Sequence, residues 1–204
     1  MTRKHAPATA RNRGPILAIL EKALPPEGTV LEVAAGTGEH AVAFAPALMP
    51  RCWLPSDRDA ENLASIAAWR DAFPSPNLLP PVRLDVCETP WPVETAPPQP
   101  PVSAIVAINL VHIAPWETTP ALMAGAARIL LPGGILYLYG PYRIDGRHTA
   151  PSNAEFDRGL KARNPEWGVR DLGDVTAAAR DAGLHLEARH AMPANNLSLI
   201  FAKS

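Results

Sequence analysis

The residues best suited to hold a ligand lie in a glycine-rich turn between an apolar segment and a helical one. Gly36, Thr37 and Gly38 follow the apolar segment 30–33, and helix-forming residues begin at His40. A strand, a glycine turn and a helix together bring backbone N–H groups and a helix N-terminus against a nucleotide-like ligand. Glycine suits such a turn because a Cβ would block close approach and because the turn can require positive φ. We expect these residues to bind a cofactor; a tight turn that serves packing alone is the alternative.

The same turn fits a dinucleotide site. The spacing Gly36-x-Gly38-x-x-Ala41 satisfies the dinucleotide fingerprint, and Asp57 lies about twenty residues further on, where a ribose-binding acid belongs. The two adjacent oxygens of the Asp57 carboxylate match a vicinal diol such as that of ribose. Capping of the following helix is the structural alternative for this carboxylate, although Asp59 competes for that position.

Glu32 is an acidic residue inside an otherwise apolar strand. Burying a carboxylate without a partner is costly, so we expect Glu32 to orient the glycine loop or to meet the ammonium group of a ligand. His40 follows the loop at a helix start, where we expect it to contact the cofactor or to cap the helix. The six histidines show no i,i+4 pair and no His-Glu-x-x-His arrangement, so no metal site is predicted.

Candidate catalytic residues follow the fourth predicted strand, 104–110. Asn109 and His112 lie at the carboxyl edge, where open α/β sheets bind their ligands. Imidazole titrates near neutrality, so His112 is a candidate general base for a hydroxyl, thiol or amine nucleophile, with a structural histidine as the alternative. His148 lies in the polar segment 143–173, a candidate substrate lid or an ordered structural loop. We expect Asn109, His112 and His148 to serve the reaction.

Alternating elements must position these side chains. Further strands are predicted at 52–54, 82–86 and 135–139, and an antiparallel pair at 184–188 and 197–201. Helices are predicted at 16–24, with Pro15 at its start, and at 60–73, 118–131, 154–163 and 175–182. The apolar run 104–110 lacks alternation, which suits a parallel strand covered on both faces. Six prolines between Thr89 and Pro101 predict an extended surface loop without a helix.

Composition limits the classes of partner. A chain of 204 residues that is 47% hydrophobic with a net charge of −1 predicts one globular domain, residues 1–204, without a nucleic-acid footprint. No apolar run is long enough to span a membrane. Cys52 and Cys87 lack any metal spacing and indicate thiols in a reducing cytoplasm. Residues 1–14 are basic and lack the apolar segment of a secretory signal, so we expect a mobile arm, with a transit peptide as the alternative.

The segment 30–38, Val-Leu-Glu-Val-Ala-Ala-Gly-Thr-Gly, resembles the first motif of class I S-adenosylmethionine (SAM) dependent methyltransferases more than a NAD site. Other segments resemble a methyltransferase-like family numbered 938 among domains of unknown function, and the similarity runs nearly end to end. They include Arg11-Asn-Arg-Gly-Pro-Ile, Pro55-Ser-Asp-Arg-Asp-Ala-Glu-Asn-Leu, Asn109-Leu-Val-His-Ile-Ala-Pro-Trp, His148-Thr-Ala-Pro-Ser-Asn and Met192-Pro-Ala-Asn-Asn-Leu-Ser-Leu.

This resemblance implies an α/β fold: a Rossmann-like sheet of seven strands, mostly parallel, with an antiparallel C-terminal hairpin and helices on both faces. It implies SAM as the cofactor. Asp85 resembles the position that meets the adenine amino group, with a plain turn carboxylate as the alternative. Arg11 and Asn12 are expected to fold over SAM, an arginine holding its carboxylate bidentately; a solvated basic arm is the alternative.

We therefore expect a SAM-dependent methyltransferase that acts on a small-molecule acceptor through an O, N or S nucleophile. The alternatives are a SAM-binding module, another SAM-consuming enzyme without methyl transfer, and a NAD-dependent oxidoreductase. Glu32 and the terminal antiparallel pair argue against the last of these. The sequence names neither the acceptor nor the oligomeric state.

Overall fold

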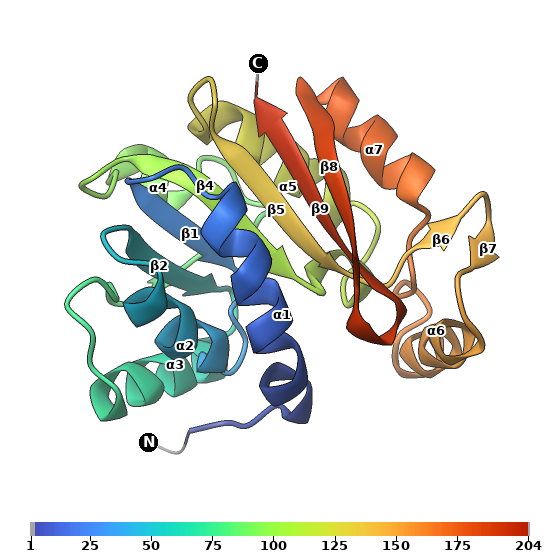
Figure 1. The fold of residues 1–204 in the computed structure, drawn as a ribbon, viewed down its shortest axis with the longest axis horizontal. Helices are drawn as coiled ribbons and strands as arrows, with labels where there is room; N and C mark the ends of the chain where they lie inside the picture. Colours follow the sequence, from blue (N-terminus) through green and yellow to red (C-terminus); the bar gives the residue numbers. More distant parts are fainter. Residues whose placement is uncertain (1–2, 204) are drawn as a thin grey trace.

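Within residues 3–203, which the computed structural model describes, seven strands form one sheet (Figure 1). In spatial order they are β3 (Val82–Arg83), β2 (Cys52–Asp57), β1 (Thr29–Val33), β4 (Val102–Ile108), β5 (Ile135–Gly140), β9 (Asn196–Lys203) and β8 (Leu184–Met192). Strands β1 to β5 run parallel, whereas β9 is antiparallel to both β5 and β8. The predicted fold class, including the antiparallel C-terminal pair, is confirmed.

Helices cover both faces of this sheet. On one face lie α1 (Pro7–Ala23) and α2 (Glu39–Ala47), and on the other lie α4 (Pro92–Thr95), α5 (Thr118–Ile129) and α7 (Leu172–Asp181). Successive strand residues point to opposite faces, and β4 shows this directly. Its Ala104 and Val106 join the core under α1 and α2, while Ile105 and Ala107 join the core under α5 and α7.

Two further helices lie beside this core. Helix α3 (Ala60–Ala72) contacts α2 and β2, and α6 (Pro151–Arg163) lies next to the turn between β8 and β9 (Figure 1). A short hairpin of β6 (Arg143–Ile144) and β7 (Arg147–His148) precedes α6. Two 3₁₀ turns, η1 (Leu110–His112) and η2 (Pro193–Asn195), follow β4 and β8. No helix in the described part of the chain is long and apolar enough to cross a membrane.

The third strand is shorter than predicted. Only Val82 and Arg83 pair with β2, because their partners Ser56 and Asp57 are the last two residues of that strand. Asp85 therefore lies in the loop beyond the strand rather than inside it.

In the described part of the expected N-terminal arm, residues 7–14 belong to a helix. Helix α1 begins at Pro7, and the Lys4 backbone N–H donates to Ser65 Oγ at 2.8 Å. Met1 and Thr2 lie outside the described residues. Pro15 was expected at a helix start but lies well inside α1, where the missing N–H removes one helical hydrogen bond to the Arg11 carbonyl.

The proline-rich segment also differs from the extended loop predicted for it. One helical turn, α4, begins at Pro92, and proline is favoured at such a start because its missing N–H would have no partner there. Trp91 is fully buried in the core beside α5. A Cβ on Gly125 of α5 would lie 2.0 Å from the indole atom Cζ2, so the helix accommodates the ring only because this residue is glycine.

Gly125→Ala should therefore lower the free energy of unfolding by about 1–3 kcal/mol, because the buried ring must shift. Chemical denaturation measures this change. The matched control is Gly159→Ala on α6, where a Cβ meets nothing within 4 Å and alanine is the better helix former. A Gly125→Ala protein as stable as wild type would contradict the packing described.

Candidate functional site

A cavity of about 430 Å³ opens beyond the carboxyl ends of β1, β2 and β4. Most of the residues expected to bind the cofactor line it: Asn12, Glu32, Gly36, Thr37, His40, Asp57, Asp85 and Asn109. Arg11 and Gly38 do not. The sheet thus brings together the polar side chains of Glu32, Asp57 and Asn109, which are up to 77 positions apart in sequence, as expected for strand ends that meet at one edge.

The two glycines of the turn have different roles. Gly36 has a φ of +59°, and a Cβ there would meet nothing within 4 Å, so its backbone faces open space in the cavity. Gly38 has a φ of +91°, and its Cβ would lie 2.8 Å from the Ile66 Cα. Gly38 is therefore needed for the close approach of α3, and it does not line the cavity.

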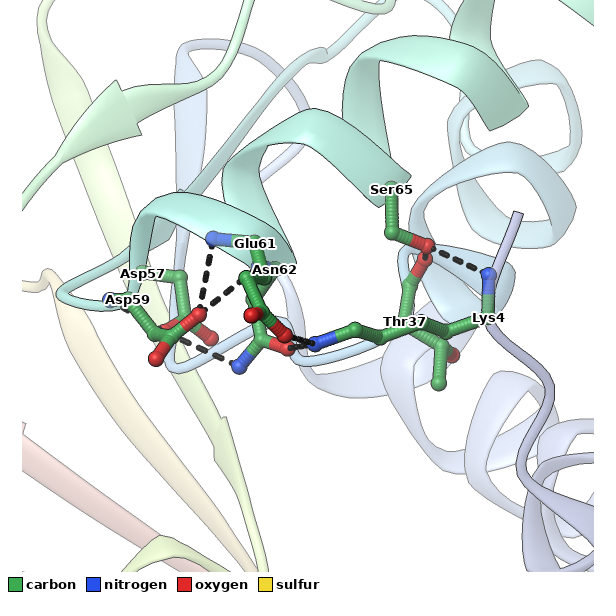
Figure 2. A network of polar contacts seen from close by, with 7 residues as sticks. All are labelled: Lys4, Thr37, Asp57, Asp59, Glu61, Asn62 and Ser65. Atoms are coloured by element: carbon green, nitrogen blue, oxygen red, sulfur yellow. Dashed lines mark hydrogen bonds and ion pairs between the residues drawn. The ribbon is translucent and has the colours of Figure 1, made fainter. Parts of the chain in front are cut away.

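Asp57 fixes the glycine turn to the end of β2. Its Oδ2 accepts the Gly36 N–H at 2.9 Å, and its Oδ1 accepts the Asp59 N–H at 3.0 Å and the Asn62 amide at 3.3 Å. Helix capping falls to Asp59, which accepts the backbone N–H groups of Glu61 and Asn62. Figure 2 shows the two carboxylates side by side at the start of α3. Helix capping, the alternative role considered for Asp57, is thus carried out by Asp59.

Glu32 is buried in the floor of the cavity. Its Oε2 accepts the Trp53 indole N–H at 2.8 Å, and the side chain has almost no contact with solvent. Burial raises the pKa of Glu32 to about 8; the indole hydrogen bond from Trp53 lowers it, and the nearby Asp57 charge raises it by a smaller amount. The Glu32 carboxyl is therefore protonated at neutral pH until a cation approaches it.

Asp85 and Arg58 form an ion pair beside the cavity. The Asp85 Oδ2 lies 3.7 Å from an Arg58 guanidinium nitrogen, and Oδ1 accepts the Cys87 backbone N–H at 3.0 Å. Both residues line the cavity, and the bond to Cys87 is also the turn contact considered as the alternative role of Asp85. Its expected contact with an adenine amino group stays a prediction.

The N-terminal segment forms one wall of the cavity. Asn12 on α1 accepts a hydrogen bond through Oδ1 from the His40 Nε2, 2.8 Å away, and both side chains are buried. Burial lowers the pKa of His40 to about 4, so the ring is neutral and carries its single proton on Nε2 to make this bond. Asn12 lines this cavity, whereas Arg11 lines only the second cavity described below; their expected contacts with SAM stay predictions.

A second set of bonds ties the residues before α1 to the glycine turn (Figure 2). Ser65 Oγ donates to the Thr37 carbonyl at 2.8 Å while it accepts the Lys4 backbone N–H. The Lys4 ammonium also contacts Glu61 and Asn62 on α3. We call Lys4 and its contacts with α3 the strap. It was not predicted from the sequence, although Pro7, a residue favoured at the start of a helix, indicates that the helix begins there.

Asn109 ends β4 in the left-handed conformation, with a φ of +61° that asparagine tolerates better than most residues. Its N–H donates to the Tyr139 carbonyl at 2.8 Å. Asn109 lines the first cavity and also a second cavity of about 400 Å³ beside α6. Ala8 and Asn12 of α1 are shared in the same way, so the two cavities adjoin.

His112 lies outside both cavities. Its ring is fully buried, packs edge-on against Tyr142, and fits there because Gly140 has no side chain. Its Nδ1 accepts the Arg170 N–H at 3.3 Å, and burial lowers the pKa of His112 to about 3. The structure corrects the expectation of a general base: the ring has no contact with a cavity in which an acceptor could lie.

His148 also lies outside both cavities. Its Nε2 is 3.6 Å from the Asp157 carboxylate, which in turn accepts the Lys161 ammonium at 2.6 Å and the Val169 N–H at 2.7 Å. These bonds hold the segment 143–173 together. We therefore assign His148 a structural role and no catalytic role.

The rest of the segment 143–173 contributes to the second cavity through α6. Ser152, Asn153 and Phe156 line it. The Asn153 amide donates to the Asn195 carbonyl at 2.9 Å, which joins α6 to the turn between β8 and β9. Among residues 3–203 no group of three or more His, Cys, Asp or Glu side chains is placed to hold a metal ion.

The buried carboxyl of Glu32 predicts a pH dependence of stability. Its pKa is about 8 in the folded protein and 4.5 as a free side chain, so its stabilising effect is complete below pH 4.5 and is lost as the pH rises through 8. Relative to Glu32→Gln, the wild-type free energy of unfolding should fall by roughly 2–3 kcal/mol between pH 5.5 and 7.5. Denaturant titrations of both proteins across this range measure the difference. Parallel pH curves would contradict the buried, protonated carboxyl.

Solved structures share this fold. An O-methyltransferase family protein from Burkholderia thailandensis matches with a TM-score of 0.78 at 16% identity, over 97% of this chain and 57% of that one. Human N-acetylserotonin methyltransferase, in a structure with SAM, matches with a TM-score of 0.77 at 12% identity, over 97% and 53%. A protein from Pyrococcus horikoshii OT3 matches with a TM-score of 0.72 at 11% identity, over 98% and 93%. The chain spans little more than half the length of the first two proteins, and the fold is that of class I SAM-dependent methyltransferases.

A family model supports the same relationship at the level of sequence. The family described as "Protein of unknown function (DUF938)" matches residues 3–203, which is nearly the whole chain. The resemblance noted from the sequence motifs is therefore confirmed, and the chain belongs to this family.

Proposed function

We propose that the protein is a SAM-dependent methyltransferase that acts on a small-molecule acceptor. The observation that carries this proposal is the cavity at the carboxyl ends of β1, β2 and β4, in which the glycine turn meets the carboxyl groups of Glu32, Asp57 and Asp85. Its volume of about 430 Å³ lies in the range of small-molecule and cofactor sites. The second cavity, which shares Asn12 and Asn109 with it, offers space for an acceptor.

The residues present fit SAM group by group. The open space at Gly36 leaves room for the methionine part, and the Glu32 carboxyl is available to its ammonium group, which would favour ionisation of the carboxyl. Asp57 would meet the ribose hydroxyls and Asp85 the adenine amino group. Leu84 and Val86, which line the same cavity, would flank the adenine ring.

Asp57 retains capacity for this contact even though the protein already uses it. Two carboxylate oxygens accept about four hydrogen bonds, and three protein donors are present at Asp57. Its position is therefore set before any ligand binds, which lowers the cost of ordering the site.

Methyl transfer from a sulfonium is an in-line displacement, for which bound SAM supplies the activated methyl group. The chain must hold donor and acceptor in line and exclude water. The Asn12–His40 pair and the strap through Lys4 close the cavity on the side of the glycine turn. Asn109 lies where the two cavities meet, which makes it the side chain best placed to orient the reacting groups.

Asp57→Asn should lower the affinity for both SAM and S-adenosylhomocysteine at least tenfold, about 1.4 kcal/mol, because the amide replaces one acceptor of the diol and removes the charge. Isothermal titration calorimetry with SAM, S-adenosylhomocysteine and NAD measures this, and NAD should give no binding heat.

The matched control is Asp59→Ala, two residues away. It removes the α3 cap and should cost about 1 kcal/mol of stability, while the affinity for S-adenosylhomocysteine stays within twofold. If NAD gives a binding heat and SAM does not, the result would indicate a NAD-dependent oxidoreductase instead. If Asp57→Asn binds SAM with unchanged affinity, the Asp57 carboxylate does not contact the cofactor.

A further inference from the structure

The second cavity has a chemical character that narrows the class of acceptor. It lies between α1, α6 and the turn after β8, and three of its lining residues are shared with the cofactor cavity. The shared residues Asn12 and Asn109 therefore mark the junction at which a donor methyl group and an acceptor would meet.

No proton acceptor lines this cavity. Its lining residues in the described part of the chain include no Asp, Glu, His, Lys or Cys. The Tyr139 hydroxyl is present, but burial raises its pKa above 10, so it stays protonated at neutral pH. His112, the residue that sequence reasoning offered as a base, is buried elsewhere. An acceptor here must therefore bring a nucleophile that is already unprotonated at neutral pH.

Among residues 3–203, Arg11 is the only charged residue that lines the second cavity. No hydrogen bond or ion pair joins its guanidinium to another residue within 3–203, so the charge is available to a ligand. Arg11 directly precedes Asn12 of the junction on α1, but it lines only the second of the two cavities. A planar guanidinium matches a carboxylate bidentately, and one positive charge balances one negative charge.

Apolar surface fills much of the remaining wall. Phe156 of α6 leaves 37% of its surface exposed although it is a large apolar residue, and Pro141 and Pro193 lie on the same cavity. The Asn153 amide is already bonded to Thr149 and to the Asn195 carbonyl. Arg11 is thus the charged group that a ligand could bind, and the apolar wall around it suits an apolar part of the same ligand.

We propose that the second cavity binds a small carboxylic acid with an apolar body and a separate nucleophile that is unprotonated at neutral pH, such as a thiolate or an acidic phenolate. This inference rests on the proposed function. The carboxylate binds Arg11, the body packs against Phe156, and the nucleophile lies at the junction of Asn12 and Asn109.

The transfer step balances without a protein base. The ionised heteroatom of the acceptor forms a bond to the methyl carbon, the bond from that carbon to sulfur breaks, and its electron pair remains on sulfur. Because the nucleophile enters without a proton, none is passed to the chain.

The test uses the whole chain with SAM labelled in its methyl group and two aromatic mercapto acids, 4-mercaptobenzoate and 3-mercaptobenzoate, whose thiols ionise near neutral pH. Their neutral methyl esters serve as matched probes. At least one acid should be methylated with a kcat/KM at least tenfold above that of its ester. Arg11→Gln should lower kcat/KM for the acid at least tenfold and leave the ester unchanged, because the variant removes only the partner of the carboxylate.

Arg13→Gln is the control, because Arg13 is exposed on the same helix and lines neither cavity. It should leave kcat/KM for the acid within twofold of wild type. If Arg11→Gln methylates the acid as well as wild type, or if the esters react as fast as the acids, the proposal is overturned. Titration of wild type with S-adenosylhomocysteine separates the two levels of inference. If this ligand binds but no acid is methylated, the acceptor class is wrong. If it does not bind, the proposed function itself fails.

Discussion

The hydrogen bond from the Gly36 N–H to the Asp57 carboxylate is the constraint on which the site depends. It joins the turn after β1 to the end of β2, and the same carboxylate binds the first turn of α3 through the Asp59 N–H and the Asn62 amide. Gly38 completes the arrangement because only a residue without a Cβ lets α3 approach the turn. The cavity is therefore shaped by the backbone and by one buried carboxylate before a ligand enters it.

Burial also sets the protonation states of the titratable groups around the cavity. The Glu32 carboxyl and the His40 ring are both close to neutral at pH 7, the first because burial raises its pKa and the second because burial lowers it. A neutral Glu32 carboxyl limits the negative charge around the glycine turn. A neutral His40 can donate to Asn12 and hold α1 in place. Protonation states thus follow from packing, and a cationic ligand would reverse the first of them.

Much of the site could be predicted from the sequence because strand ends and glycine turns leave local signals. Glu32, Asp57 and Asn109 sit at such ends, and the sheet topology alone brings them to one edge. The direction of a side chain beyond a strand leaves no such signal. His112 follows Asn109 by three residues, but the left-handed turn at Asn109 sends the chain back into the core. The wall formed by α1 depends on contacts some sixty positions away, such as Lys4 with Ser65, which no local pattern reveals.

We infer that a cofactor and an acceptor bind in two adjoining cavities that meet at Asn12 and Asn109. The decisive experiment is a crystal structure of the protein with S-adenosylhomocysteine. We expect the ribose beside Asp57, the ammonium group beside Glu32 and the sulfur directed toward Asn109, with the cavity beside α6 still free. A ligand bound in the cavity beside α6, or a sulfur directed away from Asn109, would show that this arrangement is wrong.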